Sequence, residues 1–165
     1  MTLEKYTLPP SLMAKLYPTS LISLSQTVSE NSAAAQQIKF LGSNQKQITI
    51  LVNETDTSFL SDKSFTFLTG ILTACGLNVA DVAIVNIVPH PNIHFNAIHT
   101  VTQPHTMLLF GISPEEIGLP LHFPDFQVQR FNNTVYVCAP MLGKIEADKS
   151  LKTKLWAALK SAFQL

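Results

Sequence analysis

The chain has few cysteines and few charges. Only two of its 165 residues are cysteine, Cys75 and Cys138, and two are too few for a disulfide framework or a cysteine-rich metal site. We therefore expect no cofactor, no metal and a reducing, cytoplasmic location. Charged residues make up 13% of the chain, against about 25% in an average soluble domain. Because hydrophobic residues make up 46%, intrinsic disorder is excluded, and we expect a partner to cover part of the surface.

The sequence also lacks an overall excess of charge and a long apolar run. Eleven Lys and Arg balance eleven Asp and Glu, which excludes a general basic field for nucleic acid. No run approaches the roughly 18 apolar residues of a membrane span, so we expect no membrane partner. Residues 126–165 differ, with six basic and two acidic side chains, a net charge of +4. Four lysines there predict either phosphate contacts or a solvated helix face: Lys144, Lys149, Lys152 and Lys160.

The sequence predicts two regions. Residues 1–45 form an N-terminal extension and connector, which is first apolar and punctuated by prolines and then rich in Ser, Gln and Asn. Leu12, Leu16 and Tyr17 belong to its apolar part, and Leu12 and Leu16 have the spacing of a helix that docks in a groove. We expect this extension to pack on the domain or on another chain. Residues 46–165 form the domain itself.

The domain alternates between strand-like and helix-like patterns. Short, β-branched apolar runs predict four buried strands, at residues 48–52, 82–88, 106–110 and 134–138. A helix ending near Cys75, with Gly76 as a left-handed cap, separates the first two. Shorter helices are expected at residues 95–101 and after the Ser113–Glu116 capping box, and a terminal helix at residues 151–163. Residues 126–128 have the pattern of a short further strand. This alternation predicts a three-layer α/β/α fold around a mostly parallel four-stranded sheet.

Ligand sites of such sheets lie beyond the carboxyl ends of the strands. The loops there include Asn53, Gly111, Ala139, Pro140 and Met141.

Two groups of polar residues in these loops have more than one interpretation. Glu54 and Asp56 form either an acid–base pair or a solvated turn that caps the next helix. His90 and His94 are four residues apart, but Pro91 disfavours a helix across them and no cysteine or acid lies nearby. We therefore interpret them as polar loop histidines rather than metal ligands. Because they follow the carboxyl end of a strand, contact with a ligand or partner is favoured over metal binding.

The order of several motifs resembles the uracil-DNA glycosylase superfamily over roughly residues 46–163. The family's helix ending Ala-x-Gly-Leu is similar to residues 74–77, and its strand Ile-x-Asn-Val-Val to residues 84–88. Residues 108–111 resemble the Leu-Gly ending of its third strand. Residues 139–142 and 152–156 resemble its final His-Pro-x-x-Leu loop and Lys-x-x-x-Trp helix.

The sequence departs from the glycosylase pattern where the chemistry would lie. Residues 53–56 lack the glycines and proline of the family's first loop, and Ala139 stands where the family has its catalytic histidine. Two cysteines cannot hold the family's four-cysteine iron–sulfur cluster. The resemblance therefore implies the scaffold more strongly than the reaction.

The layout of an apolar extension, a polar connector and a degenerate glycosylase-like domain is similar to that of the psi subunits of bacterial DNA polymerase III. This resemblance implies a noncatalytic accessory protein of DNA replication or repair, with a clamp-loader component or other DNA-metabolism protein as its partner. Two alternatives stay open. One is a divergent glycosylase that uses an acid of the first loop, and the other is a protein-interaction domain unrelated to DNA.

Overall fold

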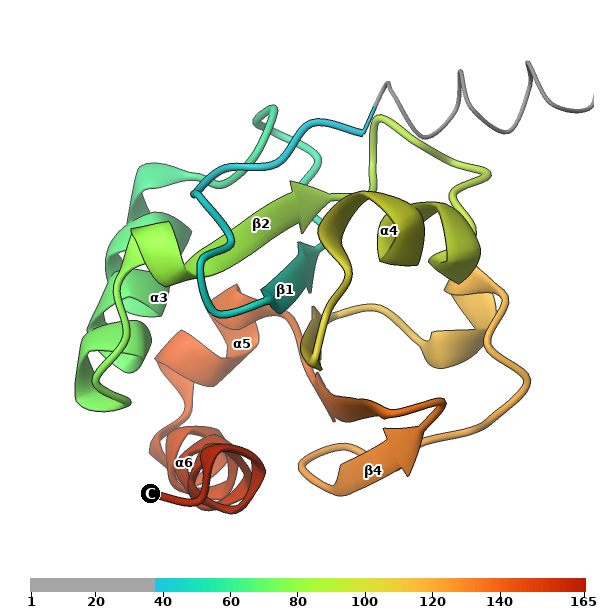
Figure 1. Cartoon of the computed structure of the whole chain (residues 1–165). Helices are drawn as coiled ribbons and strands as arrows, with labels where there is room; N and C mark the ends of the chain where they lie inside the picture. The colour runs from blue at the N-terminus through green and yellow to red at the C-terminus, as the bar shows by residue number, and fades with distance from the viewer. Residues whose placement is uncertain (1–37) are drawn as a thin grey trace, which may run out of the picture. The chain divides into compact units, whose positions relative to one another are not determined.

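The computed structural model describes residues 38–165, which form one compact unit around a five-stranded sheet (Figure 1). The strand order is β2-β1-β3-β5-β4. The first four strands of this order run parallel, and β4 is antiparallel to β5. The strands are β1 (Ile48–Val52), β2 (Val82–Asn86), β3 (Thr106–Phe110), β4 (Val128–Phe131) and β5 (Thr134–Ala139).

The predicted α/β class and mostly parallel sheet are confirmed, but the predicted number of four strands is wrong. The fifth strand, β4, pairs with β5 through a two-residue turn at Asn132 and Asn133, both of which have positive φ. Such a turn matches the twist of a β-hairpin. The strand begins at Val128, so the short apolar run at residues 126–128 overlaps only its first residue. The second strand ends at Asn86, two residues before the predicted end.

Four α-helices accompany the sheet in the described part of the chain: α3 (Asp62–Ala74), α4 (Phe95–Thr102), α5 (Leu142–Ala147) and α6 (Lys149–Phe163). Ser61 caps α3, and Gly76 has the predicted left-handed φ of 71°. The six-residue α5 was not predicted. The capping box expected at Ser113 does not form: Pro114–Ile117 is a 3₁₀-helix, and Ser113 makes no side-chain cap. No helix within residues 38–165 is long and apolar enough to cross a membrane.

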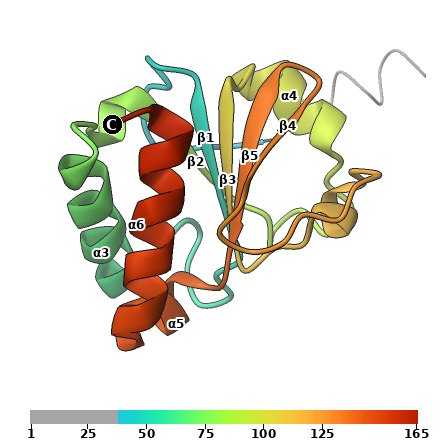
Figure 2. The ribbon, with the colours of Figure 1, turned by 90° about the horizontal axis from the view of Figure 1, so that it is seen from below.

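Helices cover both faces of the sheet (Figure 2). Alternate strand residues point to opposite faces, so Ile48, Ile50 and Val52 of β1 pack in the core beneath α3 and α6. Leu51 packs in the other core, which includes Ile98 of α4. All five residues of β1, of β2 and of β3 are buried. This double covering explains why their sequences are continuous apolar runs rather than alternating patterns.

Residues 38–46 run along the outer edge of β2. The Leu41 amide donates to the Ile84 carbonyl at 2.8 Å, the Ile84 amide donates back at 2.8 Å, and the Asn44 amide donates to the Val82 carbonyl at 3.1 Å. Ile38 is buried. The compact unit therefore includes part of the segment that the sequence assigned to the connector. The docking contacts predicted for Leu12, Leu16 and Tyr17 lie outside the described residues.

Candidate functional site

The carboxyl ends of β1, β2, β3 and β5 meet along one edge of the sheet. The chain passes from β1 to β2 through α3, and from β2 through α4 to β3 on the other side of β1. The direction of winding therefore reverses between β1 and β3, and ligand crevices of open parallel sheets lie at such a point. Asn53 and Glu54 leave β1 there, and Gly111 and Ile112 leave β3.

Asn86 organises the first loop of this edge. Its side chain is 3% exposed, and its Nδ2 donates to the carbonyls of Glu54 at 2.7 Å and Thr57 at 3.0 Å. Its Oδ1 accepts from the amides of Glu54 and Val88, each at 3.2 Å. The side-chain amide of Asn86 thus provides hydrogen-bond partners for four backbone groups of these loops that would otherwise be unpaired. Sequence reasoning missed this role, although an amide at the end of an apolar strand was a signal for it.

The Glu54 carboxylate is held against the start of α3. The Ser64 hydroxyl donates to Glu54 Oε1 at 2.8 Å, and the Ser61 hydroxyl in turn donates to Ser64 Oγ at 3.0 Å. Glu54 is half-buried, whereas Asp56 is exposed. This arrangement gives Glu54 a structural contact with a helix N-terminus, where negative charge is favourable.

The end of β3 is covered by Met141. The Gly111 amide donates to the Ala139 carbonyl at 2.8 Å, and Gly111 has a φ of +68°. A Cβ at Gly111 would collide with the Met141 side chain, so that side chain lies directly against the glycine. Ala139 is 4% exposed. Ala139 therefore contributes only a buried methyl group at the end of β5.

A hollow of about 590 Å³ lies beside Met141, between the ends of β3 and β5. Its charged side chains are of both signs: Glu116, Asp125 and Lys144. Cys138 also lines it, but burial, with a smaller effect from the Asp125 carboxylate, raises the pKa of that thiol to about 12. A thiol of this kind stays protonated near neutral pH and is a poor nucleophile.

The two predicted loop histidines have different surroundings. His94 caps α4, where its Nδ1 accepts weakly from the Asn96 amide at 3.5 Å. The His94 ring lies so close to Gly118 that a Cβ there would collide with it. His90 is half-buried in the turn after β2. Within residues 38–165 no three His, Cys, Asp or Glu side chains are grouped as metal ligands.

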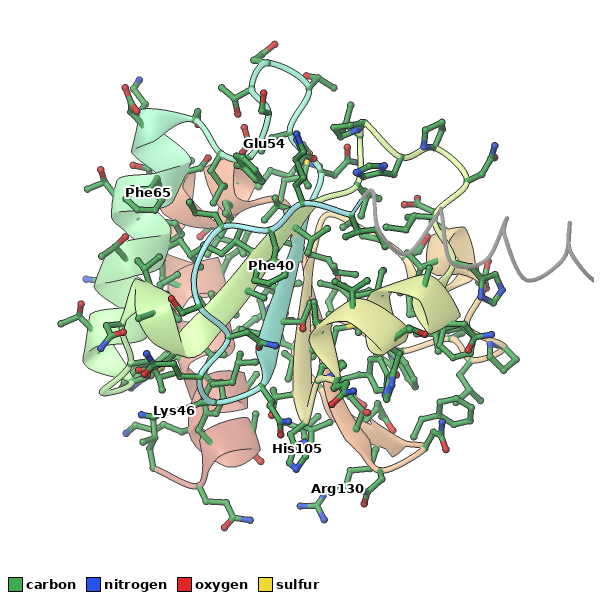
Figure 3. The ribbon with its side chains drawn as sticks, turned by 45° about the horizontal axis from the view of Figure 1, so that its top comes forward. Phe40, Lys46, Glu54, Phe65, His105 and Arg130 are labelled. Carbon is green, nitrogen blue, oxygen red and sulfur yellow. The ribbon has the colours of Figure 1, made fainter. Side chains whose placement is uncertain are left out.

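Another histidine contributes to a polar network at the amino-terminal ends of β3 and β5, on the far side of the sheet from the loops described above. His99 Nε2 lies 3.2 Å from Thr134 Oγ1, and this hydroxyl donates to the Pro104 carbonyl at 3.1 Å. Because the threonine proton is already used, His99 Nε2 must be the donor. His105 lines the same hollow as His99 and Thr134, and Figure 3 shows Glu54 and His105 at opposite ends of the sheet. The predicted acids and these histidines therefore do not form one site.

The four predicted phosphate-binding lysines are all exposed, but the structure divides them between two surfaces. Lys144 lines the hollow beside Met141. Lys152 and Lys160 lie over aromatic rings, with their Nζ atoms 5.5 Å from the centre of Phe67 and 5.4 Å from that of Trp156. Lys149 begins α6.

We expect any binding of single-stranded DNA to be weak and strongly dependent on salt. Four phosphate contacts would give a log–log slope of about −3, since each contributes about −0.7 on single strands. Replacing Lys144, Lys149, Lys152 and Lys160 by glutamine should reduce both affinity and slope without unfolding the protein. Fluorescence anisotropy at several salt concentrations measures both quantities. An affinity that does not change with salt would contradict phosphate contact.

Comparison of the chain with protein-family models and with curated proteins found no match. The geometry of this edge therefore carries the functional argument: the first loop is fixed by Asn86, Met141 lies against the end of β3, and the acidic side chains of Glu116 and Asp125 line the hollow beside it.

Proposed function

We propose that the chain is a noncatalytic accessory protein of DNA replication or repair, built on a glycosylase-like scaffold and acting through protein–protein contacts as psi subunits do. The observation that carries this proposal is the covered end of β3. Met141 lies against Gly111, and the neighbouring Ala139 is buried and has no group that could transfer a proton.

Base excision makes chemical demands that this edge meets poorly. A glycosylase needs a pocket for a flipped base and a side chain that activates water or stabilises the leaving base. Here the Glu54 carboxylate accepts a hydrogen bond from Ser64, and Asn86 fixes the backbone on either side of it. These contacts support a role for the loop in holding β1, β2 and α3 together.

A divergent glycosylase is the second candidate because Glu54 is a half-buried carboxylate beside the point where the strand order reverses. An interaction domain unrelated to DNA is the third. Capture of purified clamp-loader proteins by the full chain separates the first candidate from the third, because only the first requires that capture.

We expect the full chain to excise no uracil from single-stranded or double-stranded DNA, since no histidine stands at residue 139 and the first loop is fixed. The measurement is strand cleavage at abasic sites after incubation with uracil-containing oligonucleotides. The matched control is Glu54→Gln, which keeps the size of the side chain and removes its charge. Turnover by the natural chain that disappears in this variant would refute the proposal and establish the glycosylase.

A further inference from the structure

We propose that the groove between α3 and α6 binds an amphipathic helix of a partner protein, with an apolar face bordered by acidic residues. This inference rests on the proposed function, because it specifies the protein contact through which that function would operate. The two helices run side by side on one face of the sheet (Figure 2), and side chains from both line the groove.

The groove has an apolar floor that is open to solvent. It has a volume of about 380 Å³ and is lined mainly by Phe67, Ile71, Leu155, Trp156 and Leu159. Phe67 and Trp156 are only partly buried. Aromatic side chains in such settings are the usual anchors of protein interfaces.

Gly70 widens the groove at the middle of α3. Glycine destabilises the interior of a helix relative to alanine, yet nothing within the described chain requires it here. A Cβ at residue 70 would meet no atom within 4 Å, and its φ is not in the left-handed region. The missing side chain therefore leaves space on the outer surface, where another chain can approach closely.

The length of the groove suits a helix. Its α3 wall extends from Thr66 to Ala74, which at 1.5 Å per residue is about 12 Å, or roughly two helical turns. Two turns present apolar residues at positions i, i+3 or i+4, and i+7, the pattern of helices that dock in grooves.

The charge around the groove determines the kind of helix. α6 carries four lysines and no acidic residue between Lys149 and Phe163, and the Nζ atoms of Lys152 and Lys160 lie over the groove's aromatic rings. Asp62 and Glu146 balance Lys63 and Lys152 at one end only. The excess of positive charge lies along α6, so acidic flanking residues on the partner are complementary.

Charge also disfavours two other occupants. A second copy of the chain would bring its own lysine-rich α6 against this one. Residues 1–24 carry two lysines and one glutamate, so they do not supply the acidic border either. Binding of either occupant in the groove would overturn the proposal.

The test uses Trp156, the one tryptophan of the chain, as a reporter inside the groove. The full chain is titrated with a 16-residue amphipathic peptide that has leucines on one face and glutamates on the other. We expect saturable binding with a change in tryptophan fluorescence. A peptide with lysines in place of the glutamates should bind at least about tenfold more weakly.

Two matched pairs of variants locate the site. Gly70→Leu should weaken peptide binding by at least about thirtyfold because its side chain occupies the centre of the groove, whereas Gly143→Leu should have little effect. A Cβ at Gly143 also meets nothing within 4 Å, and Gly143 lies outside this groove. Lys152→Glu with Lys160→Glu should cost about tenfold. Lys39→Glu with Lys144→Glu changes the net charge equally but should leave affinity nearly unchanged, because both lysines are exposed and neither lies on α6 or lines the groove.

Several results would overturn this inference. The first two are absence of peptide binding, and equal peptide binding by a Gly70→Leu variant that has a native circular dichroism spectrum. The others are tighter binding of a peptide of residues 1–24 or of single-stranded DNA than of the acidic peptide, and a dimer formed through the groove. If Gly70→Leu still captures clamp-loader proteins as the natural chain does, the groove is wrong and the proposed function stands. If the peptide binds as expected but no clamp-loader protein is captured, the proposed function fails and the groove stands.

Discussion

Replacing Gly42 by alanine should lower the free energy of unfolding by about 3 kcal/mol, since it combines an unfavourable backbone conformation with a steric collision. Gly42 has a φ of +109°, and a Cβ there would collide with the carbonyl oxygens of Val82 and Val79. These atoms belong to backbone and cannot rotate away. Residues 38–46 would then have to move off the edge of β2.

Urea unfolding followed by circular dichroism measures this change. Gly143→Ala is the matched control, because its Cβ meets nothing within 4 Å and alanine is the better helix former. Size-exclusion chromatography adds a second readout, since an uncovered β2 edge can pair with other chains. A loss of stability below about 0.5 kcal/mol in Gly42→Ala would show that the edge segment adapts without cost.

Replacing Asn86 by alanine should also lower the free energy of unfolding by about 3 kcal/mol. The side chain has four hydrogen-bond partners on the backbone of two loops, and its removal leaves buried polar groups unpaired at a cost of about 1–3 kcal/mol for each that water cannot reach. The effect should extend to the Glu54–Ser64 contact, because Asn86 fixes the Glu54 backbone.

The same unfolding measurement tests this prediction, with Asn92→Ala as the control for the loss of an exposed asparagine. Hydrogen exchange of the Glu54 and Val88 amides provides a local measurement, since both donate to Asn86 Oδ1. Faster exchange at these two amides with unchanged exchange in α6 is expected. Unchanged stability in Asn86→Ala would mean that water replaces the lost amide.

Local patterns were sufficient to predict most of the regular elements. The strand at Thr106–Phe110 has the predicted bounds, because a β-branched and apolar run between polar residues is typical of a strand covered on both faces. Helix α3 ends where Gly76 indicated, since glycine takes a left-handed φ without strain. In contrast, α5 has only six residues, too few for a helical period to stand out in the sequence.

The relations between loops could not be predicted in the same way. Ser64 and Glu54 are ten residues apart, and Asn86 is 32 residues from Glu54. Such contacts depend on strand order and register, which no local pattern specifies. The sequence therefore identified Glu54 as a candidate acid, while the fold gave it a partner on α3.

The amino-acid sequence by itself determined the α/β class and the four parallel strands, because each depends on residue type and short-range periodicity. Only the tertiary structure decided that residues 38–46 cover β2, that Met141 lies over Gly111, and that Phe67, Gly70 and Trp156 share one groove. Those features join residues far apart in the chain, and their energies come from packing and hydrogen bonds that exist only after the strands have paired and the helices have covered them.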